Sequence, residues 1–235
     1  MKREFTQGLR DGVPIALGYF SVSFSFGILA MGGGLTIFQG ALTSLTNMTS
    51  AGQFAGLQII IAGGALLEMV MTQFIINLRY ALMSLSLSQK LSEKVTLLQR
   101  FIIAFANTDE IFAVAMGHQG NLTFSYMVGL QILPIIGWTS GTAVGAAAGS
   151  ILPASVTSAL NVALYGMFIA VVIPAARKVR PVLLVVILAA VMSSIIYYAP
   201  VFSGISAGMS IIICTVAASV AGAVLFPVSE EGGAQ

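Results

Sequence analysis

An acidic pair stands inside an apolar stretch of this chain. Asn107 is followed by Thr108, Asp109 and Glu110, and six apolar residues lie on each side of this group. Neighbouring side chains on a helix point about 100° apart, so one carboxyl can face a cavity while the other meets a partner. A buried carboxyl can exchange its proton near neutral pH. The pattern predicts that Thr108, Asp109 and Glu110 bind substrate and that Asp109 and Glu110 carry protons.

Asn77 and Arg79 form a second polar motif, late in another apolar segment. A guanidinium group can pair with a carboxylate of the protein or of a ligand, so we expect both residues at the substrate site. Two alternatives stay open: Arg79 can extend to the membrane interface, or Arg79 or Arg100 can form a purely structural pair with the acidic residues. Glu68 stands alone in its segment and is a third candidate for proton coupling.

Small polar residues interrupt the second long apolar run. Ser50 and Gln53 have the spacing of a capping box, so Ser50, Ala51, Gly52 and Gln53 are predicted to start a half-helix at membrane depth. The free N–H groups and the positive dipole end of such a helix can bind an anionic group, such as an amino-acid carboxylate. The alternative is a packing seam, because Gly52 and Gly56 form a Gly-xxx-Gly pattern.

The elements that carry these groups are membrane helices. No Asp, Glu, Lys or Arg occurs in residues 12–67, 111–176 or 181–229, and 57% of the chain is hydrophobic while 8% is charged. Soluble domains carry about a quarter charged residues. A helix crosses a bilayer with about 20 apolar residues, so each of these three stretches must contain several spans. The predicted location is the cytoplasmic membrane.

The predicted fold is all-α, a single polytopic transmembrane domain over residues 1–235 with about eight helices and a broken second helix. The expected spans lie near residues 13–32, 36–63, 65–88, 95–116, 122–148, 156–174, 181–199 and 203–227.

Basic residues near the span ends set the orientation. The clusters around Arg10 and Arg177 place the N-terminus and the turn after the sixth segment in the cytoplasm. Eight full crossings then put the slightly basic 88–95 loop outside. The alternative is that this loop is cytoplasmic and that one segment in each half is re-entrant.

A faint internal repeat accompanies this topology. Ala30-Met31-Gly32 followed by Leu35-Thr36 recurs as Ala115-Met116-Gly117 and Leu122-Thr123, and Thr49 to Gly52 resembles Thr139 to Thr142. The offset of about 85–90 residues equals three spans, which would invert the second copy. We therefore predict repeats over residues 13–88 and 95–174, with extra helices in 181–227; the alternative is chance similarity among small residues.

Other functional classes find little support. The net charge of +2 is too small to indicate nucleic-acid binding, and no hydrolase or phosphate-loop motif appears. The lone His118 has no ligand cluster around it, and Cys214 is the single cysteine. We therefore expect no enzyme activity, no metal and no cofactor.

The chain resembles the AzlC/YgaZ family, the large subunits of branched-chain amino-acid exporters. The motifs that carry the resemblance are Pro14 with Gly18 and Phe26-Gly27, Ser50 to Ala55, Asn77 to Arg79, and Thr108-Asp109-Glu110-x-Phe112. Ser23 to Ser25 depart from the family's usual wording, and Glu68 matches no motif of that family.

The resemblance implies export of leucine, isoleucine and valine, with methionine as a further candidate, together with a small hydrophobic membrane subunit of the AzlD/YgaH type. Proton coupling is the expected driving force. The alternatives are a non-transporting scaffold or assembly subunit, whose polar motifs only hold helices together, and a channel for another small solute.

Overall fold

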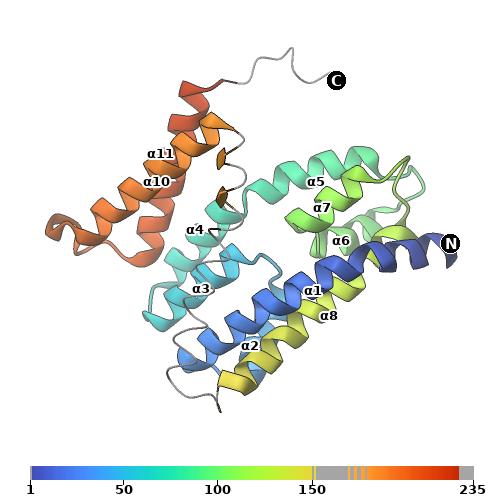
Figure 1. The fold of residues 1–235 in the computed structure, drawn as a ribbon, viewed down its shortest axis with the longest axis horizontal. Coiled ribbons are helices and arrows are strands. Elements are labelled where there is room, and N and C mark those ends of the chain that lie inside the picture. The colour runs from blue at the N-terminus through green and yellow to red at the C-terminus, as the bar shows by residue number, and fades with distance from the viewer. Residues whose placement is uncertain are drawn as a thin grey trace. The chain divides into compact units, whose positions relative to one another are not determined.

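The computed structural model describes residues 2–149, 151, 169, 172–173, 176–177 and 179–227. This part of the chain is helical, without strands (Figure 1). The helices are α1 (Lys2–Gly32), α2 (Ile37–Thr46), α3 (Ala51–Ile61), α4 (Leu66–Asn77), α5 (Arg79–Lys90), α6 (Leu97–Phe105), α7 (Asp109–Gly117), α8 (Phe124–Gly149), α10 (Arg180–Tyr198) and α11 (Ala207–Leu225), with a 3-10 turn at Pro200–Phe202.

Four of the described helices are long and apolar enough to cross a membrane: α1, α8, α10 and α11. The pair α4 and α5, interrupted at Leu78, adds a fifth candidate if it forms one broken span. This confirms the predicted all-α polytopic membrane protein. The expected span at 156–174 lies almost entirely outside the described residues.

The chain forms two compact units. One comprises Met1–Leu57 and Asn77–Leu164, and the other comprises Gln58–Ile76 and Tyr165–Gln235. In the second unit α10 packs on α11. The first unit contains most of the residues that the sequence singled out.

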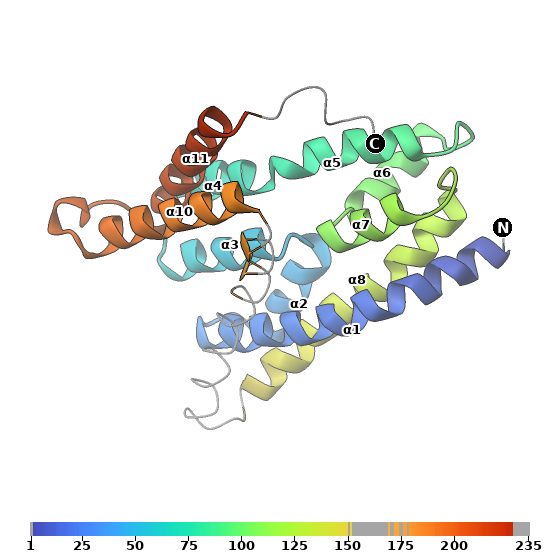
Figure 2. The same ribbon diagram turned by 45° about the horizontal axis from the view of Figure 1, so that its top comes forward.

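Glycines bring α1 and α8 of the first unit together (Figures 1 and 2). A Cβ atom on Gly12 would lie 2.6 Å from the carbonyl oxygen of Leu130, and one on Gly137 would lie 2.5 Å from that of Ala16. Further along, a Cβ on Gly145 would meet the carbonyl of Phe24. The same order along both helices shows that they run parallel. Gly137 and Gly145 of α8 therefore pack against another helix of this chain.

The loops on either side of α6 and α7 are joined by hydrogen bonds. The Ser92 amide donates to the Leu122 carbonyl at 2.8 Å, and the Leu122 amide donates to the Lys90 carbonyl at 2.9 Å. Leu91 and Leu122 form an isolated parallel bridge. The two ends of this segment therefore lie at the same membrane surface.

The full crossing expected of residues 95–116 is consequently wrong. A span about 30 Å thick would separate its ends, whereas α6 and α7 have nine residues each, about 14 Å of helix. The chain enters the membrane as α6, the helix is interrupted between Phe105 and Asp109, and α7 returns to the membrane surface from which α6 started. The re-entrant alternative is the one that fits.

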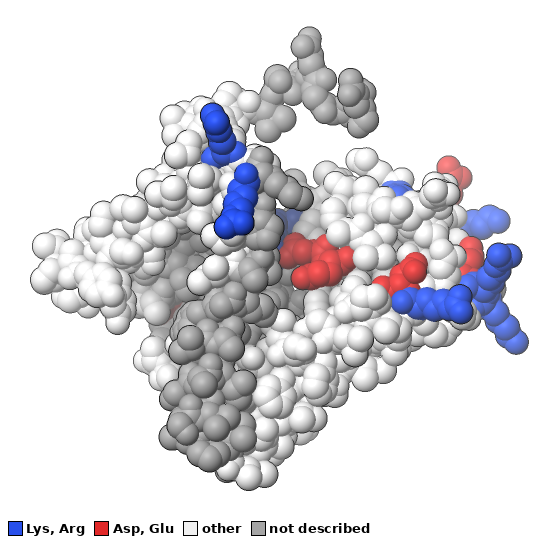
Figure 3. All heavy atoms as spheres, viewed as in Figure 1, with Lys and Arg blue, Asp and Glu red and all other residues white. Residues whose placement is uncertain are grey.

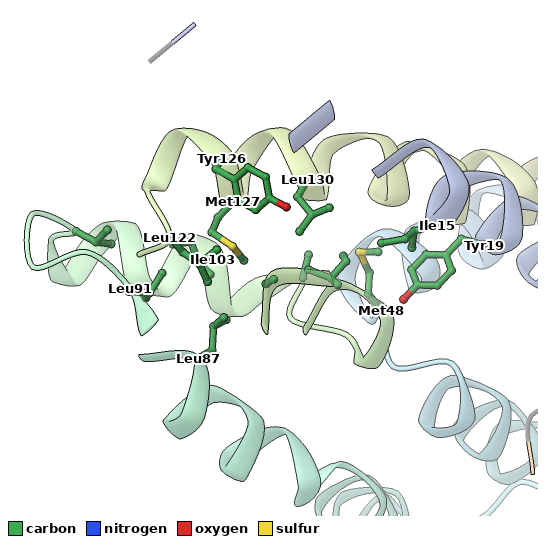
Figure 4. Close-up of a cluster of buried hydrophobic side chains, with 14 of the residues drawn as sticks. Ile15, Tyr19, Met48, Leu87, Leu91, Ile103, Leu122, Tyr126, Met127 and Leu130 are labelled. Atoms are coloured by element: carbon green, nitrogen blue, oxygen red, sulfur yellow. The ribbon is translucent and has the colours of Figure 1, made fainter. Parts of the chain in front are cut away.

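The segment formed by α2 and α3 also reverses direction. Met48, in the break after α2, lies beside Tyr19 of α1 (Figure 4). Phe54 of α3 then packs edge-to-face on Phe26 of α1, with ring centroids 5.2 Å apart. Phe26 lies seven residues, about 10 Å, further along α1 than Tyr19, towards the end of α1 at which α2 begins. The segment α3 therefore runs back in that direction. The predicted break in the second segment is present, and its second half-helix returns.

The internal repeat matches in one part and differs in another. Gly32 and Gly117 both end helices, and Thr36 and Thr123 both accept a hydrogen bond from an amide three residues on. Thr49 to Gly52, however, contains a helix break, while Thr139 to Thr142 lies within the continuous α8. Only the helix-end similarity reflects a shared local structure.

The basic 88–95 loop lies at the same end of this unit as the N-terminus. The 88–95 loop is hydrogen-bonded to Leu122, which leads into α8. There the Tyr126 hydroxyl donates to Asp11 of α1 at 2.8 Å. Figure 3 shows several basic side chains gathered at the end where the N-terminus lies, while other basic side chains stand apart from them. Basic residues at one surface agree with the usual charge asymmetry of membrane proteins.

This arrangement predicts the sidedness of three positions. Single cysteines at Arg3, Ser92 and Gln119, in a Cys214→Ala background, should all react with a membrane-impermeant maleimide from the same side of sealed vesicles. A cysteine at Leu35 should react from the opposite side, because α1 crosses between them. Labelling of Ser92 and Gln119 from opposite sides would contradict the re-entrant segment.

Candidate functional site

The breaks in the two re-entrant segments converge near the middle of α1. Tyr19 lies on this part of α1 and is buried. Its hydroxyl lies 2.5 Å from the Thr108 hydroxyl and 2.5 Å from a Glu110 carboxylate oxygen. A phenol has one proton and an ionised carboxylate only accepts. Tyr19 therefore donates to Glu110 when that group is charged, and Thr108 supplies the second hydrogen bond.

The start of α7 is built to hold acidic groups. Thr108 occupies the N-cap position, but its hydroxyl bonds to Tyr19 instead of capping the helix. Asp109 and Glu110 follow in the first turn, where the helix dipole stabilises negative charge by about 0.3–1 kcal/mol each. Two carboxylates are thereby placed at the break.

Arg79 pairs with the first of these acids. Its guanidinium lies 2.6 Å from Asp109, and both side chains are 44% exposed. The neighbouring Tyr80 accepts a hydrogen bond from Arg79 at 3.3 Å and donates to the Thr49 carbonyl at 3.5 Å. The first turn of α5 therefore contacts both breaks.

Ring packing followed by a series of buried hydrogen bonds connects Tyr19 to the half-helix α3. The Tyr19 ring packs edge-to-face on Trp138 of α8 at 5.3 Å. The indole N–H of Trp138 donates to Gln53 at 2.9 Å, and the Gln53 amide donates to Ser44 at 2.6 Å. Ser44 in turn bonds to Thr142 of α8 at 2.6 Å. These hydrogen bonds fix α2 and α3 on α8.

The predicted capping box at Ser50 and Gln53 is wrong. The Gln53 side chain is 1% exposed and turns to Trp138 and Ser44 instead of back to Ser50. Ser50 adopts a φ of +49°, the left-handed region that non-glycine residues avoid. The half-helix does begin at Ala51, but tertiary contacts and a strained turn define its start. Ser50 and Ala51 are half-buried and Gly52 is buried.

The structure brings Ser50 to Gln53, Arg79 and Thr108 to Glu110 into one unit, with the half-buried Asn77 at the end of α4. Glu68 belongs to the other unit. Its carboxylate accepts a hydrogen bond from Ser206 at 2.6 Å and from the Gly208 amide at 2.9 Å, at the start of α11. These contacts place the Glu68 carboxylate at the N-terminus of α11, where the helix dipole stabilises negative charge, and the proton-coupling role of Glu68 stays a prediction.

Sequence reasoning missed Tyr19, Tyr80 and Trp138. Tyr19 and Trp138 are buried aromatic residues with a polar group inside apolar helices, and such a group normally finds a partner. That property marks both as contacts of polar groups elsewhere, although it does not say which ones, whereas the half-buried Tyr80 at the start of α5 carries no such signal. Within the described residues no three His, Cys, Asp or Glu side chains gather as metal ligands.

Comparison with known proteins shows the family of this chain. The family described as AzlC protein matches residues 14–152, which include most of α1, both re-entrant segments and α8. This chain belongs to the AzlC family.

Two relatives illustrate its range. An uncharacterized membrane protein of Archaeoglobus fulgidus is 34% identical over 172 residues, 72% of this chain and 75% of that protein. The inner membrane protein YgaZ of Escherichia coli is 29% identical over 150 residues, 62% of this chain and 61% of its own length. No solved structure matches. Family and relatives together support a membrane protein with a transport-related role.

The Trp138–Gln53 contact makes a prediction about stability. Gln53→Leu should destabilise the protein by about 1–3 kcal/mol, because it leaves the buried indole N–H without an acceptor. Trp138→Phe removes that donor, so the double variant should cost clearly less than the sum of the single variants. Thermal unfolding of the purified protein in detergent measures this, and strict additivity would mean that the contact carries no energy.

Proposed function

We propose that this protein is the larger subunit of a secondary exporter for hydrophobic amino acids, chiefly leucine, isoleucine and valine. The observation that carries the proposal is the convergence of two broken re-entrant segments on the half-exposed Arg79–Asp109 pair. Non-helical backbone at membrane depth is tolerated where it is buried in protein or lines a cavity. Transporters use such half-helix ends to bind substrate.

The pair offers complementary charges to a zwitterion. An amino-acid carboxylate would bind Arg79 and the N–H groups at the start of α3, near Ser50 to Gln53, and the ammonium would bind Asp109 or Glu110. Each charge of the substrate would then replace one partner of the existing ion pair. Binding would exchange one set of charge contacts for another.

Glu110 is our candidate for the proton carrier, with Asp109 as the alternative. Its hydrogen bond to Tyr19 connects its charge state to the centre of α1 and, through Trp138, to α3. A proton on Glu110 would add an O–H donor and remove the negative charge that strengthens the hydrogen bond from Tyr19. Protonation would in this way be communicated to the other half-helix.

We further propose that the protein works in the cytoplasmic membrane with its N-terminus in the cytoplasm, paired with a small hydrophobic membrane subunit of the AzlD/YgaH type. The uncharged helix faces of the first unit provide surface for such a partner. Co-purification from membranes tests this association directly.

The acidic residues can be tested with a matched control. Asp109→Asn and Glu110→Gln should abolish leucine export while the protein stays in the membrane, because an amide keeps hydrogen bonds but does not titrate. Glu93→Gln, at an exposed position of the 88–95 loop, should export normally. The measurement is export of labelled leucine from cells that express both subunits, and full activity of both site variants would contradict the proposal.

Substrate chemistry gives a second test. Leucinamide lacks the carboxylate and should compete with leucine at least about tenfold more weakly, since a hydrogen bond to a charged group contributes about 1.5–3 kcal/mol. Competition in reconstituted vesicles measures this. Equal competition by the amide and the acid would reduce the Ser50 to Gln53 break to a packing feature.

A further inference from the structure

A small cavity lies between α5 and α6, beside the second break. Its volume is about 190 Å³, and all its lining residues belong to the first unit. Leu87 and Ile103, 3% and 1% exposed, form buried parts of its wall. An apolar protein cavity of about 150 Å³ holds a benzene molecule, so this one is the size of a short aliphatic side chain.

Two polar bridges bracket the cavity. At one end the Asn107 amide donates to the Ser84 hydroxyl at 3.2 Å. At the other end the Arg100 guanidinium donates to the Ser88 hydroxyl and carbonyl and to the Val95 carbonyl. The bridges join α5 to α6 and leave apolar wall between them.

Asn107 has an unused acceptor. The residue is 5% exposed, and its side-chain oxygen is buried without a hydrogen-bond partner. Such a group destabilises the protein unless something donates to it. Asn107 lines the cavity and directly precedes Thr108 and Asp109 in the chain. A ligand with its ammonium group at this break and its apolar part in the cavity would satisfy the oxygen.

We propose that this cavity is the side-chain pocket of the substrate site, and that the Asn107 oxygen accepts a hydrogen bond from the substrate's ammonium group. The ligand is an α-amino acid with a short branched aliphatic side chain. Asn107 orients it, while Ala104 and Ile103 limit its size. This inference rests on the proposed function and adds the residues that set specificity.

Filling the cavity tests the pocket. Ala104 lines it and is exposed, so Ala104→Phe should fold. The ratio of leucine to alanine affinity should then fall about 10- to 200-fold, the range over which an apolar pocket discriminates. Ala81→Phe changes an exposed alanine of α5 that does not line the cavity, and it should keep the original ratio. Competition against labelled leucine in reconstituted vesicles gives both values.

Asn107 has its own test. Asn107→Leu should weaken leucine binding roughly 10- to 150-fold, from the loss of a hydrogen bond to a charged group, and leave 4-methylpentanoate, which has no ammonium, unchanged. Asn107→Asp keeps an acceptor and should retain leucine binding. Equal losses for both ligands would overturn the role of Asn107.

The outcomes separate this inference from the proposed function. If the unaltered protein exports leucine and Ala104→Phe leaves selectivity unchanged, the pocket is wrong and the exporter stands. If the unaltered protein neither binds nor exports amino acids, both are wrong.

Discussion

The hydrogen bonds of Tyr19 connect the parts of the first unit that would otherwise be most costly in a membrane. A broken helix exposes backbone N–H and C=O groups, and lipid offers them no partner. Tyr19 holds the break between α6 and α7 in place. Its hydroxyl forms hydrogen bonds with Thr108 and Glu110, while its ring packs on Trp138. Phenylalanine could supply the ring but not the hydrogen bonds.

Tyr19 can hold this break only if α1 and α8 are fixed relative to each other, and the glycines of the two helices provide that close packing. Where a Cβ would collide with the facing carbonyl, as at Gly12 and Gly137, the two backbones approach as closely as small-residue seams allow. Helices α1 and α8 are therefore packed so closely that they form one rigid support. Tyr19 and Trp138, placed on its two helices, stand at a fixed separation, and through them the two re-entrant segments share one support.

The sequence allowed the membrane class, the long helices and the first break to be predicted, because each depends on local composition. For the second break the sequence favoured a full crossing over the re-entrant alternative, because residues 95–116 satisfy the length rule for a span. Two nine-residue helices folded back on each other have the same composition as one crossing. Thr108 followed by two acids is nonetheless a helix-start signal, and it could have identified the break.

Tertiary partners account for the other differences. Gln53 has the spacing of a capping residue, but its acceptor is used by Trp138, 85 residues away, and no local pattern announces such a contact. Glu68 was noticed for its isolation in an apolar segment. Its hydrogen bonds to Ser206 and Gly208 offset the cost of placing a charge there, and those partners follow more than 130 residues later.

The exposure of the Arg79–Asp109 pair bears on whether it can be part of a working site. A fully buried pair costs about 3–5 kcal/mol when one partner is lost, and a ligand that separated it would have to make up that energy. A pair that water reaches is worth about 0–1 kcal/mol. With both side chains 44% exposed, the pair lies nearer the second limit. A zwitterion can therefore take over both charges at low cost and leave again, as a carrier must allow. The contact of Trp138 with Gln53 is buried and can keep α3 in place on α8 while the occupant of the site changes.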